Sequence, residues 1–452
     1  MSGHPPVDQG RGQVSGPCEP IYFGSGEHGL FGWLHRPTGD SPESTTGLVI
    51  CKPFGYEAIC AHKSIRGFAE ASAAIGVPAL RFDYLGTGDS ADISPDANQL
   101  EVWSKDVLAA IAELQRRTGV KRVCLLGIRL GAVLATIAAA QCECVDSIVA
   151  ISPIVSGRRF LRDIRTTRLA AGLAGDAGNS PGGDKPVNDG SMEVSGYSLS
   201  AATLAALAQL DLTTAARPAR GMLIIDGSSM PVARKWSEAL SGGAGRTEYL
   251  SLPGLIEMIM TAPHDAKPPQ AMVEAMCHWL KGVPDGQAAP AETGDSRALD
   301  GGPISPTTVL ELPGDGPARD AVITERAVSI DSRVPVFGIL AEPRFGEARR
   351  RAVILVNAGS TYHIGPNRVH VSLARHWAKC GYLVLRIDLS GLGDSSRRPE
   401  ALDNDVYPPD ALDDIRAAIE FVRTRYGMDD ITLCGFCSGA YHSLRAAVAA
   451  MP

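Results

Sequence analysis

Two five-residue stretches that follow apolar runs carry glycine at both ends, and they differ at the central residue. The later stretch, GFCSG at 435–439, follows the apolar run 431–434 and centres on the thiol of Cys437. The earlier stretch, GIRLG at 127–131, follows the apolar run 123–126 and centres on Arg129. Glycine-x-nucleophile-x-glycine is typical of a sharp strand-to-helix turn that pushes its central side chain out of the sheet. A cysteine at that centre can attack a carbonyl carbon, whereas an arginine cannot.

Cys437 is therefore the candidate catalytic residue, acting on an ester or thioester. At the start of a helix, the helix dipole and free N–H groups stabilise a thiolate. The N–H of Ser438, with one from the loop at Gly359 and Ser360, would form an oxyanion hole. The Ser438 side chain itself is expected to pack or to cap the helix. The competing interpretation of Cys437 is a small buried cysteine at a tight turn.

Two further observations leave this chemistry open. No histidine of the second half clearly fits the general base, since His442 falls on the helix after Cys437 and His363 falls on the predicted oxyanion loop. Cys434 and Cys437 also form a C-x-x-C pair, which would suit thiol–disulfide exchange. This alternative is less favoured because a thioredoxin-like fold would not supply the repeated turn. Cys434 is then expected to be a core residue of the strand.

A second pair of landmarks repeats at nearly the same distance. The stretch 83–90 reads DYLGTGDS and the stretch 388–395 reads DLSGLGDS, each at the end of a predicted strand. The separation is 305 residues from Asp83 to Asp388 and 308 residues from Arg129 to Cys437. Two matched landmarks at nearly one offset indicate an internal duplication. Asp83 and Asp388 are expected to fix the loop of this turn rather than to transfer protons.

Strands alternate with helices ahead of both glycine frames, which predicts α/β architecture with doubly wound, mostly parallel sheets. In the first half we expect a hairpin at 21–34, strands at 48–51, 78–83, 147–151, 222–226 and 247–250, and helices at 65–74, 102–115 and 268–279. In the second half we expect strands at 336–340 and 353–356 and one beginning at 383, and helices at 369–380 and 411–426.

These elements predict two domains of unequal completeness. We expect a flexible tail at 1–19, a first domain at 20–281 with an inserted cap at 156–215, a linker at 282–320, and a partial second domain at 321–452. The cap should contain a basic amphipathic helix at 158–165, a mobile segment at 171–190 and a helix at 198–210. The chain stops one helix after Cys437, so we expect the natural product to be longer. A sheet cut short there should expose apolar surface and favour self-association.

Composition limits the classes of partner. The chain has 452 residues, 44% of them apolar, which is ordinary for a protein that buries a core. Its formal net charge of -7 gives no electrostatic reason to expect nucleic acid. Ten scattered cysteines and an N-terminus without an apolar signal segment favour a reducing cytoplasm. We expect no membrane span, because charged residues interrupt the apolar stretch 132–151. No metal-ligand, P-loop or dinucleotide spacing stands out, so no cofactor is expected.

Beyond the tail, the chain resembles the α/β-hydrolase superfamily, on the two glycine frames and the turns described above. More narrowly, the first half resembles the exosortase-A-system-associated hydrolases that carry G-x-R-x-G, with GYSLS at 196–200 as a second matching stretch. The second half resembles those with cysteine at the turn, with YHIGPNR at 362–368 as its second stretch. That family is associated with bacterial exopolysaccharide and surface-protein sorting, so the resemblance implies a context more than a reaction.

Set against this superfamily, the first half lacks the residues of hydrolysis. The usual position of the acid holds Met230 and that of the histidine holds Glu257, while His264, seven residues on, is expected at the surface. Arg129 could hold a carboxylate or phosphate, or it could be structural and paired with Glu257 or another acid. The ligand-binding candidates of this half are Arg129, Phe54, Glu257 and His264.

The sequence thus predicts a tandem of α/β-hydrolase domains, the first catalytically silent and the second a thiol hydrolase. Cys437 would form an acyl-enzyme with a small acylated substrate, which water then releases. Without a clear base, the chain as given should be inactive or very weak. The alternative is a non-catalytic protein that binds an acylated or anionic metabolite, or that serves as a scaffold in an exopolysaccharide-related system, with Arg129 holding the ligand.

Overall fold

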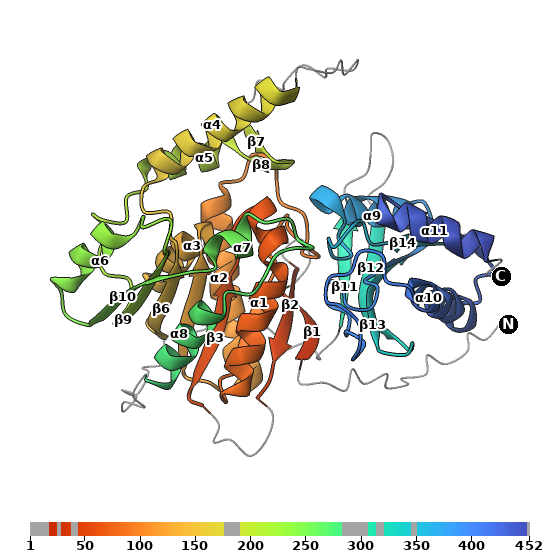
Figure 1. The fold of residues 1–452 in the computed structure, drawn as a ribbon, viewed down its shortest axis with the longest axis horizontal. Helices are drawn as coiled ribbons and strands as arrows, with labels where there is room; N and C mark the ends of the chain where they lie inside the picture. The colour runs from red at the N-terminus through yellow and green to blue at the C-terminus, as the bar shows by residue number, and fades with distance from the viewer. Residues whose placement is uncertain are drawn as a thin grey trace.

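The computed structural model describes residues 18–24, 29–37, 44–175, 190–282, 306–312, 321–344 and 350–449, and only the backbone at 167–175, 311 and 321. The predicted tail at 1–19 lies outside the described residues up to residue 17, and its last two residues belong to a strand that begins at Cys18. Most of the predicted linker also lies outside the described residues. Two sheets, each with helices on both faces, stand side by side (Figure 1).

The first sheet has eight strands in the order β1-β2-β4-β3-β5-β6-β9-β10. Its strands are β1 Cys18–Phe23, β2 Leu30–His35, β3 Thr46–Cys51, β4 Ala79–Phe82, β5 Arg122–Ile128, β6 Val145–Ile151, β9 Gly221–Gly227 and β10 Arg246–Leu252. Strand β2 pairs antiparallel with both β1 and β4, and the six strands from β4 to β10 are parallel. The predicted hairpin and the mostly parallel sheet are confirmed.

Two layers of helices bury this sheet. Helices α1 Tyr56–Ala74, α7 Leu255–Ile259 and α8 Gln270–Lys281 share one hydrophobic core with it, and α2 Gln99–Thr118 and α3 Leu130–Ala139 share the other. Helix α6 Arg234–Ser241 lies between β9 and β10 in the chain. Helix α1 is longer than the predicted 65–74 because it begins directly after Gly55, whose φ of 62° ends the preceding loop.

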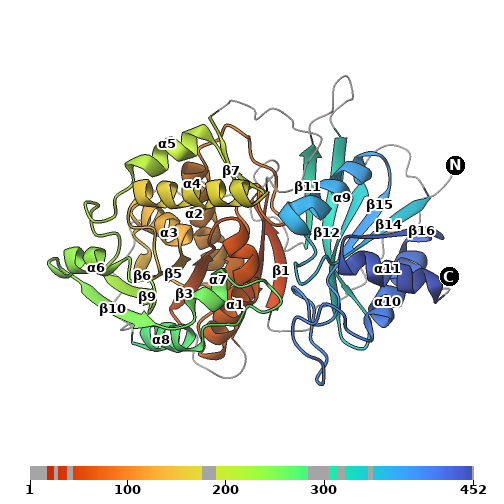
Figure 2. The same cartoon turned by 45° about the horizontal axis from the view of Figure 1, so that its top comes forward.

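The insertion after β6 contains α4 Gly157–Gly175, a hairpin of β7 Met192–Val194 and β8 Tyr197–Leu199, and α5 Ala201–Gln209. Helices α4 and α5 lie next to each other above the first sheet (Figure 2). The predicted mobile segment 171–190 is helical up to Gly175, and 176–189 lie outside the described residues. The predicted helix 198–210 begins only at Ala201, because the Ser200 hydroxyl accepts the Thr203 N–H at 3.0 Å and caps it.

The second sheet has six strands in the order β11-β12-β13-β15-β14-β16. Its strands are β11 Thr307–Leu312, β12 Ala321–Ile330, β13 Val336–Pro343, β14 Arg351–Val356, β15 Leu383–Ile387 and β16 Asp430–Gly435. The prediction of a linker over 282–320 is wrong at β11, which pairs antiparallel with β12 along its whole length. The alternation in TTVLEL favours that strand, and Leu310 and Leu312, two residues apart, are both buried.

The order β12-β13-β15-β14-β16 of the second sheet matches β1-β2-β4-β3-β5 of the first. The helices of this half are the short η2 Pro366–Arg368, α9 Val369–Lys379, α10 Ala411–Tyr426 and α11 Ser438–Val448. The halves meet through β2 and β13, where the rings of Trp33 and Phe337 lie 4.7 Å apart. In the part of the chain that the structure describes, no helix is both long and apolar enough to cross a membrane.

Candidate functional site

Both glycine frames form the sharp turn that the sequence predicts. Arg129 lies between β5 and α3 with φ 55° and ψ -114°, and Cys437 lies between β16 and α11 with φ 52° and ψ -117°. Such angles cost a residue other than glycine about 1–3 kcal/mol. The glycine at 439 is needed because a Cβ there would lie 2.6 Å from the carbonyl oxygen of Asn357 in the loop after β14. The two turns therefore share one backbone geometry although their central side chains differ.

The Cys437 thiol is exposed, and the side chain of Phe436 beside it is 43% exposed. Ser438 is buried, and its hydroxyl accepts the N–H of Gly359 at 2.9 Å. That contact occupies one of the donors predicted for an oxyanion hole and ties α11 to the loop after β14. Ser360, the next residue of that loop, instead lines a cavity between the two halves. The turn therefore presents its sulfur to solvent, but Gly359 does not offer a free N–H beside it.

Three histidines lie in the second half near this turn, and each is buried. His442 Nε2 is 3.0 Å from the carbonyl oxygen of Val406, and burial lowers the pKa of His442. His363 is held between two carboxylates, as described below. His370, which no sequence motif indicates, stacks on Phe436 with ring centroids 5.7 Å apart, and burial lowers its pKa to about 4. None of these contacts brings a histidine nitrogen to the Cys437 sulfur.

The side chain of Arg129 is held by two partners from the first half. Its Nε donates to Glu57 Oε1 at 3.2 Å and its Nη1 donates to the carbonyl oxygen of Ser152 at 3.2 Å. Burial raises the pKa of Glu57, and Arg129 opposes that rise. The acid paired with Arg129 is thus Glu57 on α1 and not Glu257, which is exposed on α7.

His264 is half exposed and lies 3.3 Å from the carboxylate of Asp265, in agreement with the predicted surface position. Asp226, at the end of β9, was not predicted as a site residue. It is buried, accepts the N–H of Ala233 at 2.8 Å and the hydroxyl of Tyr249 at 2.9 Å. These partners make Asp226 part of the first sheet's framework.

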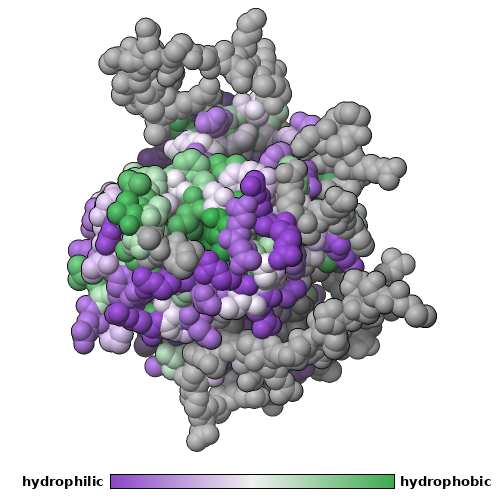
Figure 3. All heavy atoms as spheres, turned by 90° about the vertical axis from the view of Figure 1, so that its right-hand side faces the viewer, coloured by the Kyte–Doolittle hydropathy of each residue, from purple (hydrophilic) through white to green (hydrophobic). Residues whose placement is uncertain are grey.

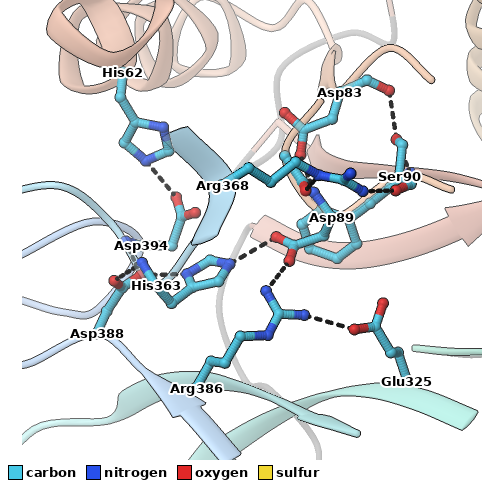
Figure 4. Close-up of polar contacts among 12 residues, drawn as sticks. His62, Asp83, Asp89, Ser90, Glu325, His363, Arg368, Arg386, Asp388 and Asp394 are labelled. Atoms are coloured by element: carbon cyan, nitrogen blue, oxygen red, sulfur yellow. Dashed lines mark hydrogen bonds and ion pairs between the residues drawn. The ribbon is translucent and has the colours of Figure 1, made fainter. Parts of the chain in front are cut away.

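The densest set of buried charges lies where the two halves meet (Figure 4). His363 Nδ1 lies 2.8 Å from Asp388 of its own half, and its Nε2 lies 2.7 Å from Asp89 of the first half. Arg386 donates to Asp89 at 2.6 Å and to Glu325 at 2.8 Å. All five side chains are essentially inaccessible to solvent. Charge balance at the boundary therefore depends on residues from both halves.

The protonation of this cluster follows from its charges. Burial alone would lower the pKa of His363, but the carboxylates of Asp89 and Asp388 outweigh burial and raise it to about 10. Burial would raise the pKa of Asp89, but His363 and Arg386 hold it well below its usual value. His363 is thus an imidazolium that bridges two carboxylates, and it has no lone pair with which to accept a proton from a thiol.

The contacts across the boundary occur in corresponding pairs. Arg81 of β4 donates to Asp394 at 2.7 Å, and Arg386 of β15 donates to Asp89 at 2.6 Å. Arg66 of α1 points to the carbonyl oxygens of Gly393 and Ser395 at 3.5 Å each, and Arg368 donates to those of Gly88 at 2.8 Å and Ser90 at 2.6 Å. Each DxxGxGDS turn is therefore held by arginines of the other half.

The predicted role of Asp83 and Asp388 is confirmed by their contacts within these turns. Asp83 accepts the N–H of Asp89 at 3.1 Å, and Asp388 accepts the N–H of Asp394 at 2.9 Å. His363, Asp388 and Asp394 place three possible ligand atoms within 4.8 Å of one another. His363 already contacts Asp388 and Asp89, and Asp394 already pairs with Arg81. The carboxylates of this cluster are therefore neutralised by cationic side chains of the chain itself.

The two larger cavities found among the described residues lie along the same boundary, and neither is lined by Cys437 or Arg129. The larger, of about 330 Å³, is lined by the loop after β3, the turn after β4, α2, the β7–β8 hairpin and residues 362–372 of the second half. The smaller, of about 220 Å³, is lined by α1 and by Ser360 and the turn after β15. Of the four ligand-binding candidates named from the sequence, only Phe54 lines the larger cavity.

Comparison with known proteins agrees with this fold. Residues 352–451 match the family model of the alpha/beta hydrolase fold. Comparison with curated protein sequences found no match. Solved structures with a similar fold include a serine hydrolase without lid from Xanthomonas campestris, at 17% identity over 59% of this chain and 97% of that one, with a TM-score of 0.36.

Two further similar structures have comparable scores. Est1E from Butyrivibrio proteoclasticus, solved with ferulic acid bound, is 17% identical over 58% of this chain and 96% of its own, with a TM-score of 0.40. An alpha-beta serine hydrolase homologue from Coxiella burnetii is 13% identical over 58% of this chain and 95% of its own, with a TM-score of 0.36. The family match and the strand order together indicate an α/β-hydrolase-type fold with a mostly parallel sheet.

Proposed function

We propose that this protein is a hydrolase-fold acyl-transfer protein whose nucleophile is Cys437, acting on an ester or thioester. The observation that supports this proposal is the exposed thiol at a turn with φ 52°, at the N-terminus of α11. Its sulfur would bond to the carbonyl carbon, and the alcohol or thiol would leave with a proton. Water would then cleave the acyl–sulfur bond and restore the thiol.

The first half is proposed to be a non-hydrolytic copy. Support comes from Arg129 at the turn, whose guanidinium is bound by Glu57 and by a backbone carbonyl. The shared strand order and the paired landmarks support an internal duplication. The resemblance of the halves to exosortase-A-system-associated hydrolases supports a role in an exopolysaccharide-related system.

The test is acylation of the protein by a p-nitrophenyl ester, followed by intact mass and peptide mapping. Since the histidines near the turn are bound or buried, we expect the acyl group to form on Cys437 and to leave slowly, so that an adduct accumulates. Cys380→Ala removes another exposed thiol and should not change the adduct. Equal ester turnover and equal labelling in Cys437→Ala and the parent would remove the proposal.

A second candidate function is binding of a small molecule without turnover, and the cavity of about 330 Å³ favours it. Its size lies within the range typical of ligand pockets, about 300–1,000 Å³. Thiol–disulfide exchange remains the least favoured alternative, because burial raises the pKa of Cys434 and so disfavours its thiolate.

A further inference from the structure

We propose that the larger cavity is a binding site for an uncharged, mainly apolar molecule with an aromatic ring or a short acyl chain, and that the second half completes this site. The inference rests on the second candidate function above and does not require Cys437 to be a nucleophile. It assigns the second half a role in ligand binding that neither glycine frame indicates.

The walls of the cavity are aromatic on the side of the first half. Tyr84 and Trp103 stack with centroids 5.4 Å apart, Phe54 lies 5.9 Å from Trp103, and Tyr197 lies 6.0 Å from Phe54. Phe54 and Tyr84 follow β3 and β4, Trp103 lies on α2, and Tyr197 comes from β8. Such a continuous set of rings favours burial of apolar and aromatic groups.

The second half supplies the facing wall. Its lining residues are Tyr362, Ile364, Asn367, Arg368 and Ser372. Tyr362 stacks on His62 of α1 with centroids 4.0 Å apart, which fixes one side of the cavity across the boundary. The β7–β8 hairpin approaches the same segment so closely that a Cβ on Gly196 would overlap the side chain of Asn367. The cavity is therefore enclosed only when the two halves and the hairpin are together.

The charged groups that line the cavity are already matched by this chain, so they do not select an anionic ligand. Lys52 Nζ lies 2.5 Å from Asp83 Oδ1. Arg368 binds the carbonyl oxygens of Gly88 and Ser90 and the carboxylate of Asp92. A ligand with a net charge would have to break one of these partnerships or enter a buried site without a counter-ion, which is costly. The expected ligand is therefore neutral.

Binding of a neutral fluorescent probe, N-phenyl-1-naphthylamine, tests this inference on the full chain. We expect one saturable site in the parent. Tyr197→Ala should weaken binding about 10-fold, as expected for loss of one aromatic contact with the probe. Ala58→Phe, at a half-buried position that lines the cavity, should fill it and abolish saturable binding. Ile364 lines the cavity from the second half, so Ile364→Ala should also weaken binding if the second half completes the site.

Matched variants separate this site from other causes. Tyr56 lies on α1, does not line the cavity and is 44% exposed, so Tyr56→Ala should leave binding unchanged. Leu444→Asp controls for adsorption to exposed apolar residues of α11. Cys437→Ala should bind as the parent does, so a failure of acylation and a failure of this inference are distinguishable.

Far-UV circular dichroism and a thermal melt establish that each variant is folded. The inference would be overturned if the parent showed no saturable binding. It would also be overturned if folded Tyr197→Ala and folded Ala58→Phe both bound the probe as tightly as the parent does.

Discussion

His363 Nε2 lies 2.7 Å from Asp89 Oδ2, and this contact joins the loop after β14 to the turn after β4 across the boundary between the halves. Its other nitrogen meets Asp388, so one imidazolium neutralises carboxylates from both sheets. The protonation state of this one ring therefore contributes to charge balance on both sides of the boundary.

The first prediction concerns pH. The pKa of His363 is about 10 in the folded protein against an ordinary value of 6.5, so its contribution to stability is full below about pH 6.5 and is lost as pH rises through about 10. The free energy of unfolding of the parent should fall steadily between pH 7 and pH 10.5 in denaturant titrations. His363→Gln should be less stable at pH 7 and should show a smaller fall over that window. His264→Gln, at an exposed site, should follow the parent; an identical slope in His363→Gln would contradict the assignment.

The second prediction concerns the corresponding arginines. Arg386→Met removes the arginine that Asp89 and Glu325 share, leaving Asp89 with His363 and Glu325 with Arg375. Arg81→Met removes the arginine of the buried carboxylate of Asp394. Removing one partner of a buried pair typically costs about 3–5 kcal/mol. Urea unfolding should show losses of that size in both variants. Arg416→Met, which removes an exposed pair with Asp413, should cost less than about 1 kcal/mol. Similar small losses in all three would show that the boundary is not held by these contacts.

A third prediction concerns Arg129 as a structural residue. Arg129→Met leaves Glu57 without its guanidinium in a partly buried place, and we expect a loss of about 1–2 kcal/mol. The pKa of Glu57 should rise further in this variant, so the loss should grow as pH increases from 4 to 7. The double variant Arg129→Met/Glu57→Gln should recover part of the loss, whereas Glu257→Gln in the same background should not. Recovery with Glu257→Gln instead would reassign the partner.

A fourth prediction concerns association. The second half exposes Phe436, Tyr441, Leu444 and Val448, and Figure 3 shows hydrophobic residues gathered on this face. In the described part of the chain, β16 pairs only with β14, so its other backbone edge is open. We expect concentration-dependent association by light scattering, reduced by Leu444→Asp and unchanged by Arg416→Asp on α10. A monomer at every concentration would contradict this expectation.

Local patterns in the sequence predicted the turns and most elements. The glycine frames specify the bends at Arg129 and Cys437 because only glycine permits the close backbone approach there. Apolar runs and helical spacing predicted β14, α10 and the strands around them. Neither β11 nor β12 was predicted from the sequence. The neighbours of β11 are rich in glycine and proline, and its pairing with β12 outweighs a weak local signal.

The site was less predictable, for a physical reason. Asp89 and His363 are 274 residues apart, and nothing in the local sequence of either indicates that they meet. Arg129 was expected to pair with Glu257 or another acid, and only the packing of α1 identifies Glu57. The larger cavity is lined by the β7–β8 hairpin, α2 and the second half together. These segments are far apart in the chain, and no pattern of residue spacing in the sequence indicates that they come together.

The bend at Arg129 has a practical consequence for protein engineering. Its backbone already has the angles that direct a serine or cysteine side chain away from the sheet, although Arg129 itself is not a nucleophile. A designer who wished to install catalysis in the first half would not have to rebuild the loop, and would need only to choose three side chains around a bend that already exists.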